Sequence, residues 1–262
     1  MKDHTLRQIT TEDFAAAVSA DAPLVILLPV GSVEPHGPHL TLLTDTIISE
    51  ASAQLAAQRL AEQGITAWIA PAVPYGVTEC AAGFKGAISV PGEILSNYLT
   101  AVVQGFLANG ADQVCLVNNH LEPDHYDAVL AAAKPFSPGQ CPVACPLSRR
   151  WARTLSEEFK RGECHAGRYE TALVLAAAPG SVKGKVQAGL PEVAISLSAS
   201  LKAGKKRFTE MGLESAYAGA PALATEKEGR ELLDRLATMV VTEVVEALQV
   251  QDPAAWGPRG VR

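Results

Sequence analysis

The sequence predicts an α/β fold, in which helices cover both faces of a mostly parallel central sheet to form a three-layer sandwich. Short, nearly continuous apolar runs, typical of strands buried on both faces, alternate with longer segments of helical periodicity. Apolar residues make up 48% of the chain and charged residues only 19%, which is enough for a large core. We therefore expect residues 1–262 to form a single domain.

Three strand-and-helix units follow one another in the first half of the chain. The predicted strands are residues 24–30, 66–70 and 113–117. The predicted helices are residues 46–60, with Asp45 in a capping position, residues 91–110, and a third that opens at Pro123. Right-handed crossovers join such units, and ligands then bind at the carboxyl ends of the strands.

The second half of the chain is less regular. Residues 180–220 are rich in glycine, with several serines and lysines, and we expect them to form loops around or beside the site. Residues 226–248 carry apolar side chains mostly three and four apart, which predicts a long amphipathic helix over the core.

Composition disfavours several classes of partner. The net charge of −6 argues against nucleic acid or an anionic membrane held by bulk charge. The apolar runs are much shorter than the roughly 20 residues that a membrane span needs. The start of the chain lacks the apolar stretch of a signal peptide, and five scattered cysteines suit reduced thiols. We expect a cytoplasmic protein with a small-molecule partner.

Potential metal ligands follow the first and third predicted strands. Glu34, His36 and Asp45 come after the first strand, and His120 and Glu122 come after the third. Mixed imidazole and carboxylate ligands suit zinc and manganese, and two ions about 4 Å apart can activate a water and polarise a carbonyl. This pattern predicts hydrolysis assisted by two divalent ions, zinc and/or manganese. The alternatives are a capped turn for the first three residues and solvent-facing loop residues for the other two.

These residues also carry a family resemblance. The stretches LPVGSVEPHGPH (28–39) and TDT (44–46) resemble the creatininase, or creatinine amidohydrolase, family, and the resemblance spans nearly the whole chain. It implies an α/β fold with a two-metal site. Glu34, Asp45 and His120 would hold one ion. His36, Asp45 and Glu122 would hold the other, so that Asp45 bridges the pair. The stretch NNHLEP (118–123) keeps a carboxylate found in creatininase itself.

The resemblance also implies catalytic roles. His165, within HAG (165–167), resembles the histidine that passes a proton to the leaving nitrogen, and Glu122 would assist deprotonation of the attacking water. Relatives of this kind form homo-oligomers, and creatininase is a hexamer. A homo-oligomer is therefore expected here.

The chain departs from the family pattern around the expected substrate pocket. Ala81 stands where the family has histidine, and Arg161 stands where creatininase has tryptophan. An anionic substrate group is therefore expected, held by Lys85, Arg161 and Arg168. The resemblance implies cleavage of a carbon–nitrogen bond in a small, cyclic or anionic amide. The alternatives are a deformylase or small-peptide hydrolase on the same scaffold, and a non-catalytic metal-binding relative.

Overall fold

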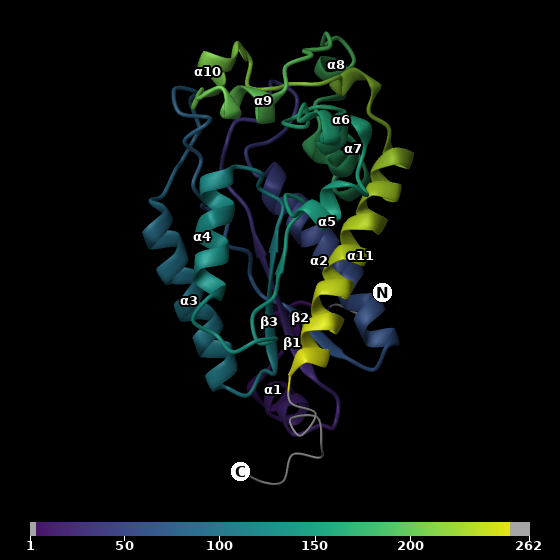
Figure 1. Ribbon diagram of the computed structural model, residues 1–262. Coiled ribbons are helices and arrows are strands. Elements are labelled where there is room, and N and C mark those ends of the chain that lie inside the picture. Colours follow the sequence, from purple (N-terminus) through teal and green to yellow (C-terminus); the bar gives the residue numbers. More distant parts are fainter. Residues whose placement is uncertain (1–3, 252–262) are drawn as a thin grey trace.

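A computed structural model describes residues 4–251, so that residues 1–3 and 252–262 of the expected domain lie outside the described part of the chain. A sheet of four parallel strands lies at the centre of that part, in the order β2-β1-β3-β4 (Figure 1). The strands are β1 (Leu24–Val30), β2 (Thr66–Ile69), β3 (Gln113–Asn118) and β4 (Val143–Ala144). The first three are the strands that the apolar runs predict, and β1 and β3 are buried throughout.

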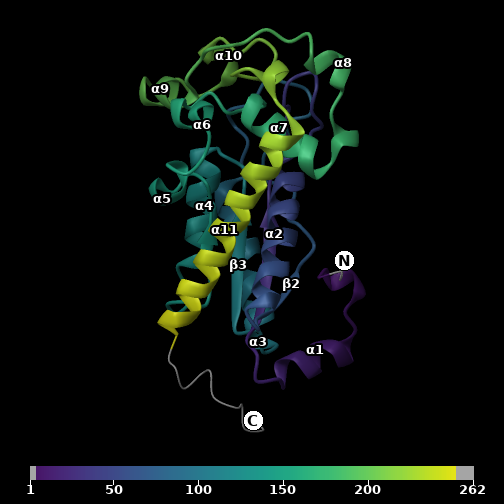
Figure 2. The same cartoon turned by 90° about the vertical axis from the view of Figure 1, so that its right-hand side faces the viewer.

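Alternate side chains of β1 enter two different cores. Val25 and Leu27 pack among residues of three helices on one face of the sheet. Leu24, Ile26 and Leu28 pack among residues of two helices on the other face. The first group of helices is α2 (Thr44–Glu62), α7 (Arg168–Ala177) and α11 (Glu226–Val250), and the second is α3 (Gly92–Ala108) and α4 (Pro123–Ala133). Figures 1 and 2 show these layers from two sides, and they confirm the predicted three-layer sandwich.

The strand order creates a switch point between β1 and β3. The chain leaves β1 through α2 to reach β2 on one side, and it leaves β3 through α4 to reach β4 on the other. The loops after β1 and β3 therefore diverge, which opens a crevice at the carboxyl ends of these neighbouring strands. The predicted metal ligands belong to these two loops and to the start of α2.

The start of α2 differs from the prediction in a way that concerns the site. The helix begins at Thr44 instead of residue 46, and Leu43 is its N-cap, without a side-chain capping bond. Asp45 therefore lies in the first turn and is not a cap. Its carboxylate points to two histidines instead of the free N–H groups of the helix.

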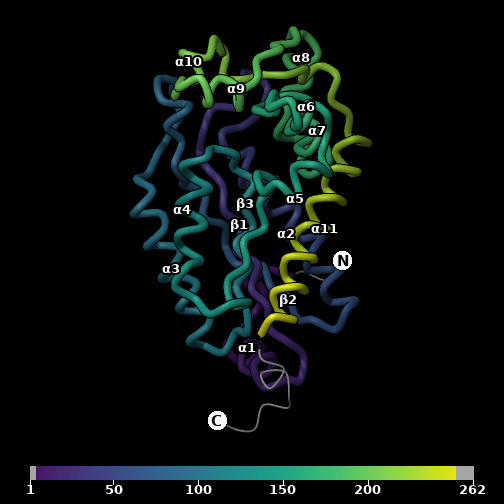
Figure 3. Tube along the Cα trace, viewed as in Figure 1, coloured from purple at the N-terminus to yellow at the C-terminus, as the bar shows by residue number. Residues whose placement is uncertain are grey.

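The predicted loop region over the crevice contains short helices. We use the name roof segment for residues 184–223, which include α8 (Gly184–Gln187), α9 (Leu197–Lys202) and α10 (Phe208–Met211). Figure 3 shows this segment crossing the end of the molecule opposite α1 (Thr11–Val18). Between β4 and α7 the chain forms α5 (Arg149–Ala152) and α6 (Glu157–Arg161). In the described part of the chain, no helix is both long and apolar enough to cross a bilayer.

Candidate metal centre

The five predicted ligands lie together at the switch point, and all are nearly inaccessible to solvent. Asp45 is central, because its Oδ1 lies 3.2 Å from His36 Nε2 and its Oδ2 lies 3.0 Å from His120 Nδ1. Glu34 Oε1 lies 3.4 Å from His120 Nδ1 and 3.7 Å from His36 Nε2. Glu122 faces Glu34 and His120 from the start of α4. One carboxylate thus lies between the two imidazoles, as a bridging ligand would.

The two central histidines present one ring nitrogen each to the cluster. His120 Nε2 lies 2.7 Å from Val77 O, and His36 Nδ1 lies 3.1 Å from Glu34 O. Because a carbonyl oxygen only accepts, these nitrogens carry the protons. The opposite nitrogens, His120 Nδ1 and His36 Nε2, therefore face the carboxylates, which is the orientation that metal-binding histidines adopt.

Glu170, in the first turn of α7, completes the cluster and was not among the predicted ligands. Its Oε2 lies 3.4 Å from His36 Nε2, and Glu170 can share an ion with His36 and Asp45. The resemblance instead implies Glu122 in that position, whereas the structure groups Glu122 with Glu34 and His120. The sequence contains a signal for Glu170, because this carboxylate lies five residues after His165, close to the HAG stretch (165–167).

The chemistry of the cluster fits divalent cations. In the described part of the chain, no lysine or arginine lies within ion-pair distance of its four carboxylates, which are those of Glu34, Asp45, Glu122 and Glu170. His36 Nε2 and Asp45 Oδ2 are buried and make no hydrogen bond of good geometry. Buried carboxylates without a cation are strongly disfavoured, and bound metal ions relieve this.

Electrostatics point the same way. Burial disfavours the charged imidazole of His36, but the carboxylates of Asp45, Glu170 and Glu34 outweigh burial and raise its pKa to about 10. Burial raises the pKa of Glu170 to about 8. Burial also acts to raise the pKa of Asp45, but His36 and His120 outweigh it, so that this pKa is lowered. Without a metal, groups such as His36 and Glu170 hold protons, and the binding of metal ions would displace these protons.

His165, the predicted acid/base residue, lies beside the cluster. Its Nδ1 is 3.7 Å from Glu34 Oε1, and its ring packs between those of His36 and Phe208. Burial and the neighbouring His36 lower the pKa of His165 to about 4, so its ring is neutral near pH 7. Nε2 lies 3.1 Å from Pro35 O and carries the proton, which leaves Nδ1 free to accept one.

A hydrogen-bonded network holds His120 in place. The N–H of Val77 donates to His125 Nδ1, and His125 Nε2 donates to Asn118 Oδ1. The same Asn118 oxygen accepts from the backbone N–H of His120. Gly76 makes room for this arrangement, since an added Cβ would lie 2.4 Å from His125 Nδ1. His125 therefore positions a predicted ligand without joining the cluster.

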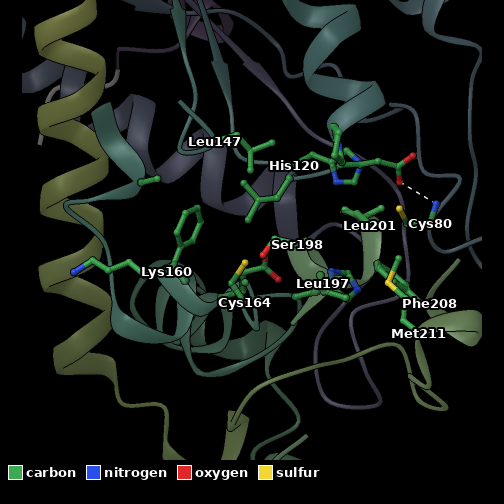
Figure 4. Close-up of a pocket in the computed structure, with 18 of the residues that line it drawn as sticks. Cys80, His120, Leu147, Lys160, Cys164, Leu197, Ser198, Leu201, Phe208 and Met211 are labelled. Atoms are coloured by element: carbon green, nitrogen blue, oxygen red, sulfur yellow. Dashed lines mark hydrogen bonds between the residues drawn. The ribbon is translucent and has the colours of Figure 1, made fainter. Parts of the chain in front are cut away.

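A cavity of about 630 Å³ opens from the cluster toward the roof segment. Glu34, His120, Glu122, His165 and Glu170 form its inner wall. Figure 4 shows Cys80 and His120 at one side and Lys160 at the opposite side, with Ser198 between them; its dashed line is the hydrogen bond from Cys80 N to Glu122. Most of the other lining side chains are apolar: Leu121, Leu147, Phe159, Leu197, Leu201, Phe208 and Met211.

The cations predicted to hold the substrate are not the cations at this cavity. Lys85, Arg161 and Arg168 are absent from its described walls. Arg161 Nε pairs with Glu163 at 2.9 Å, and Arg168 Nε pairs with Glu228 at 2.7 Å. The cavity is instead lined by Arg149, Arg153 and Lys160, which sequence reasoning missed. Tertiary placement and local pairing decide which cations line the cavity, and contact of Lys85, Arg161 and Arg168 with a substrate stays a prediction.

Two cysteine thiols that line the cavity are not activated. Burial, with Glu122 nearby, raises the pKa of Cys80, and burial with Glu170 nearby raises that of Cys164. Both thiols therefore stay protonated near neutral pH, which suits packing better than nucleophilic attack.

Comparisons with known proteins agree with this geometry. The family model "Creatininase: Creatinine amidohydrolase" matches residues 7–244. A mycofactocin precursor peptide peptidase of Mycobacterium tuberculosis (strain ATCC 25618 / H37Rv) is 29% identical over 92% of this chain and 93% of its own length. A creatinine amidohydrolase of Pseudomonas putida is 28% identical over 44% of each chain.

Solved structures share the fold. A putative creatinine amidohydrolase from Bacteroides fragilis NCTC 9343 superposes with a TM-score of 0.73 at 18% identity, covering 95% of this chain and 98% of its own. Further neighbours include creatininase in a manganese form and a mutant in a zinc–zinc form, with TM-scores of 0.66 and 0.69. The predicted fold and the predicted class, a hydrolase acting on carbon–nitrogen bonds, are confirmed. This chain belongs to the creatininase family.

Proposed function

We propose that this protein is a two-metal hydrolase that cleaves a carbon–nitrogen bond in a small amide, with short peptides as the favoured substrates. The observation that carries the proposal is the buried cluster around Asp45, in which four carboxylates and two central imidazoles face one another at the inner end of a cavity. Ligands of this kind in this arrangement suit paired zinc or manganese ions.

Each ligand has a proposed place. Glu34, His120 and Glu122 would hold one ion, and His36 and Glu170 would hold the other, with Asp45 between them. Zinc and manganese are proposed because solved creatininases contain these metals. When bound, the two ions would lower the pKa of a water and polarise the carbonyl of the amide.

The protein's own side chains would move the protons. His165 is neutral near pH 7 and has Nδ1 free, so it accepts a proton as water attacks the carbonyl carbon. The same imidazole then donates this proton to the nitrogen as the carbon–nitrogen bond breaks, which leaves a carboxylic acid and an amine. The backbone N–H groups of Glu79 and Cys80 donate hydrogen bonds to Glu122. These bonds would hold the Glu122 carboxylate beside the water and the substrate carbonyl.

Cavity size supports a peptide over a compact cyclic amide such as creatinine. The volume of about 630 Å³ is large enough for a substrate of several residues. A peptide peptidase is also among the relatives that align with almost the whole chain. Hydrolysis of a cyclic amide or a formamide on the same cluster remains the alternative. The single domain, the homo-oligomer and the cytoplasmic location stay predictions.

The Asp45→Asn variant tests the metal centre, because it keeps the buried volume and removes the charge between the two imidazoles. We expect the metal content, measured by inductively coupled plasma mass spectrometry, to fall from about two ions per chain toward none, and kcat/KM for a cleaved peptide to fall about 1000-fold. Asp234→Asn is the control, since that carboxylate pairs with Arg59 at the surface. An Asp45→Asn protein that retains both ions contradicts the bridging role.

A substrate screen tests turnover itself. Zinc- or manganese-loaded protein is incubated with creatinine, formamides, lactams and short peptides, and released amines are quantified. Cleavage of peptides is the expected result. A protein that holds its metals and cleaves none of these compounds is instead the non-catalytic relative.

A further inference from the structure

Two arginines project from the region of α5 toward the cavity. Arg149 begins α5 and Arg153 follows its last residue in helical conformation, so the two lie four residues apart on one face. Both are exposed at the surface and both line the cavity. A pair of guanidinium groups therefore stands at the cavity's solvent side, whereas carboxylates and imidazoles form its inner wall.

These arginines differ from other arginines nearby. Arg150 pairs with Glu246 at 2.6 Å and stacks on Trp151, and Arg161 and Arg168 each pair with a glutamate. The side chains of Arg149 and Arg153 have no ion-pair or hydrogen-bond partner among residues 4–251. Lys160, the third cation at this cavity, is paired with Glu157. The two unpartnered guanidinium groups have their fork-like donors available for an anion.

The surface between the arginines and the metal-ligand cluster is apolar. Leu121 and Leu147 line it from the segments after β3 and β4, Phe159 lines it from α6, and Leu197 and Leu201 line it from α9 in the roof segment. In Figure 4, Leu147, Leu197 and Leu201 lie between Lys160 and the Cys80 side of the cavity. The inner end of a ligand that fills the cavity would therefore face the metal ligands, and its middle would face the apolar side chains. Its outer end would face Arg149 and Arg153.

We propose that Arg149 and Arg153 form a carboxylate-binding subsite, so that the preferred substrates are amides with an apolar group next to the scissile bond and a carboxylate beyond it. The order of surfaces along the cavity carries this inference. Charge-assisted contacts from guanidinium to carboxylate are strong and directional, and the apolar walls favour a hydrophobic group between the two ends. The inference rests on the proposed function only for the position of the scissile bond.

The first test is kinetic. Acetylated peptides ending in one, two or three leucines are supplied as free acids and as carboxamides, because the span from cluster to arginines sets which length fits. We expect KM to be about tenfold lower for the best acid than for its carboxamide. The double variant Arg149→Gln/Arg153→Gln should abolish this difference. Arg150→Gln is the control, since it removes one positive charge from the same helix at a residue that does not line the cavity, and it should preserve the difference.

The second test does not need turnover. Calorimetric titration compares N-acetylleucine with N-acetylleucinamide on wild-type protein and on the same variants. We expect tighter binding of the acid, lost in the double variant and kept in Arg150→Gln. Phenyl phosphate is a third probe, and if it bound more tightly than N-acetylleucine and lost this advantage in the double variant, the assignment of the ligand as a carboxylate would be overturned.

The outcomes separate this subsite from the proposed hydrolysis. Peptides that stay intact while the acid binds through Arg149 and Arg153 uphold the subsite and reject the hydrolysis. Cleavage with equal KM for acids and carboxamides upholds the hydrolysis and rejects the subsite. A preference for acids that survives the double variant also rejects the subsite.

Discussion

The inner wall and the roof of the cavity are built in different ways. The inner wall comes from the loops after β1 and β3 and from the start of α7, and its side chains are buried and contact one another or the neighbouring Asp45. The roof segment consists of short helices joined by loops, and an apolar cluster around Phe208 and Leu213, together with scattered hydrogen bonds, connects it to the rest of the molecule. Examples are Phe208 N to Cys80 O and Leu197 N to Gly162 O.

One buried carboxylate adds a further attachment of the roof segment. Glu158 is buried and accepts hydrogen bonds from the backbone N–H groups of Arg168, Tyr169 and Ala220. The first two groups are the free donors at the start of α7, and the third belongs to the roof segment. Gly167 and Gly219 allow this close approach, because a Cβ at either would lie within 2.6 Å of a Glu158 oxygen. The comparison teaches that regular elements position the candidate metal ligands, whereas scattered apolar contacts and hydrogen bonds, among them those of the buried Glu158, attach the roof segment.

Removing the anchor is expected to have the largest effect on this contrast. Glu158→Ala leaves three backbone donors without their acceptor and should lower the free energy of unfolding by about 3 kcal/mol. Urea denaturation followed by circular dichroism measures this change. Glu157→Ala is the control, since the carboxylate of Glu157 neighbours Glu158 in the sequence but is exposed and pairs with Lys160. A change in Glu158→Ala no larger than in the control would show that the roof does not depend on this anchor.

A smaller effect is expected at the support of the inner wall. His125→Leu removes the link between Val77 and Asn118, so that His120 loses part of its orientation. Metal affinity should weaken about tenfold, as measured by competition with a chromophoric chelator. His4→Leu, outside the cavity, should leave the affinity unchanged. Equal affinities for His125→Leu and the wild-type protein would contradict a positioning role.

The smallest effect is expected for a cation that the sequence suggests but the structure does not bring to the cavity. Arg161→Gln removes a surface charge that is paired with Glu163, so KM for acidic peptides should change less than about twofold. The same assay on Arg149→Gln provides the comparison. A tenfold increase in KM for Arg161→Gln would mean that the roof rearranges to bring this side chain to the substrate.

The inner wall could be predicted well because local sequence specifies it. Apolar runs indicate β1 and β3, and parallel strands bring the residues that follow them, such as Glu34 and His120, to one edge of the sheet. Asp45 was expected to cap the helix, and only the packed structure shows that its carboxylate instead lies within ion-pair distance of His36 and His120. Glu170 was missed because its closeness to His165 in the sequence does not show that α7, packed against α2 and α11, brings its carboxylate to the cluster.

The roof could not be predicted to the same extent. Helices as short as α9 and α10 cannot show the periodic spacing of apolar residues that predicts a helix, and a glycine-rich sequence is typical of a loop. The sequence did not single out the cations that line the cavity, for a related reason. Arg153 and Arg161 look alike in sequence, and only their surroundings decide that one faces the cavity while the other is paired with Glu163.

The contacts of Glu158 bear on how new specificities can arise on this scaffold. Its three partners are main-chain amides, which every amino acid except proline provides. Side chains that line the cavity can therefore be exchanged without loosening the contact that Glu158 makes between the roof segment and the start of α7. Directed evolution confined to α5 and α9 is accordingly a practical route to retarget the enzyme while its reaction stays the same.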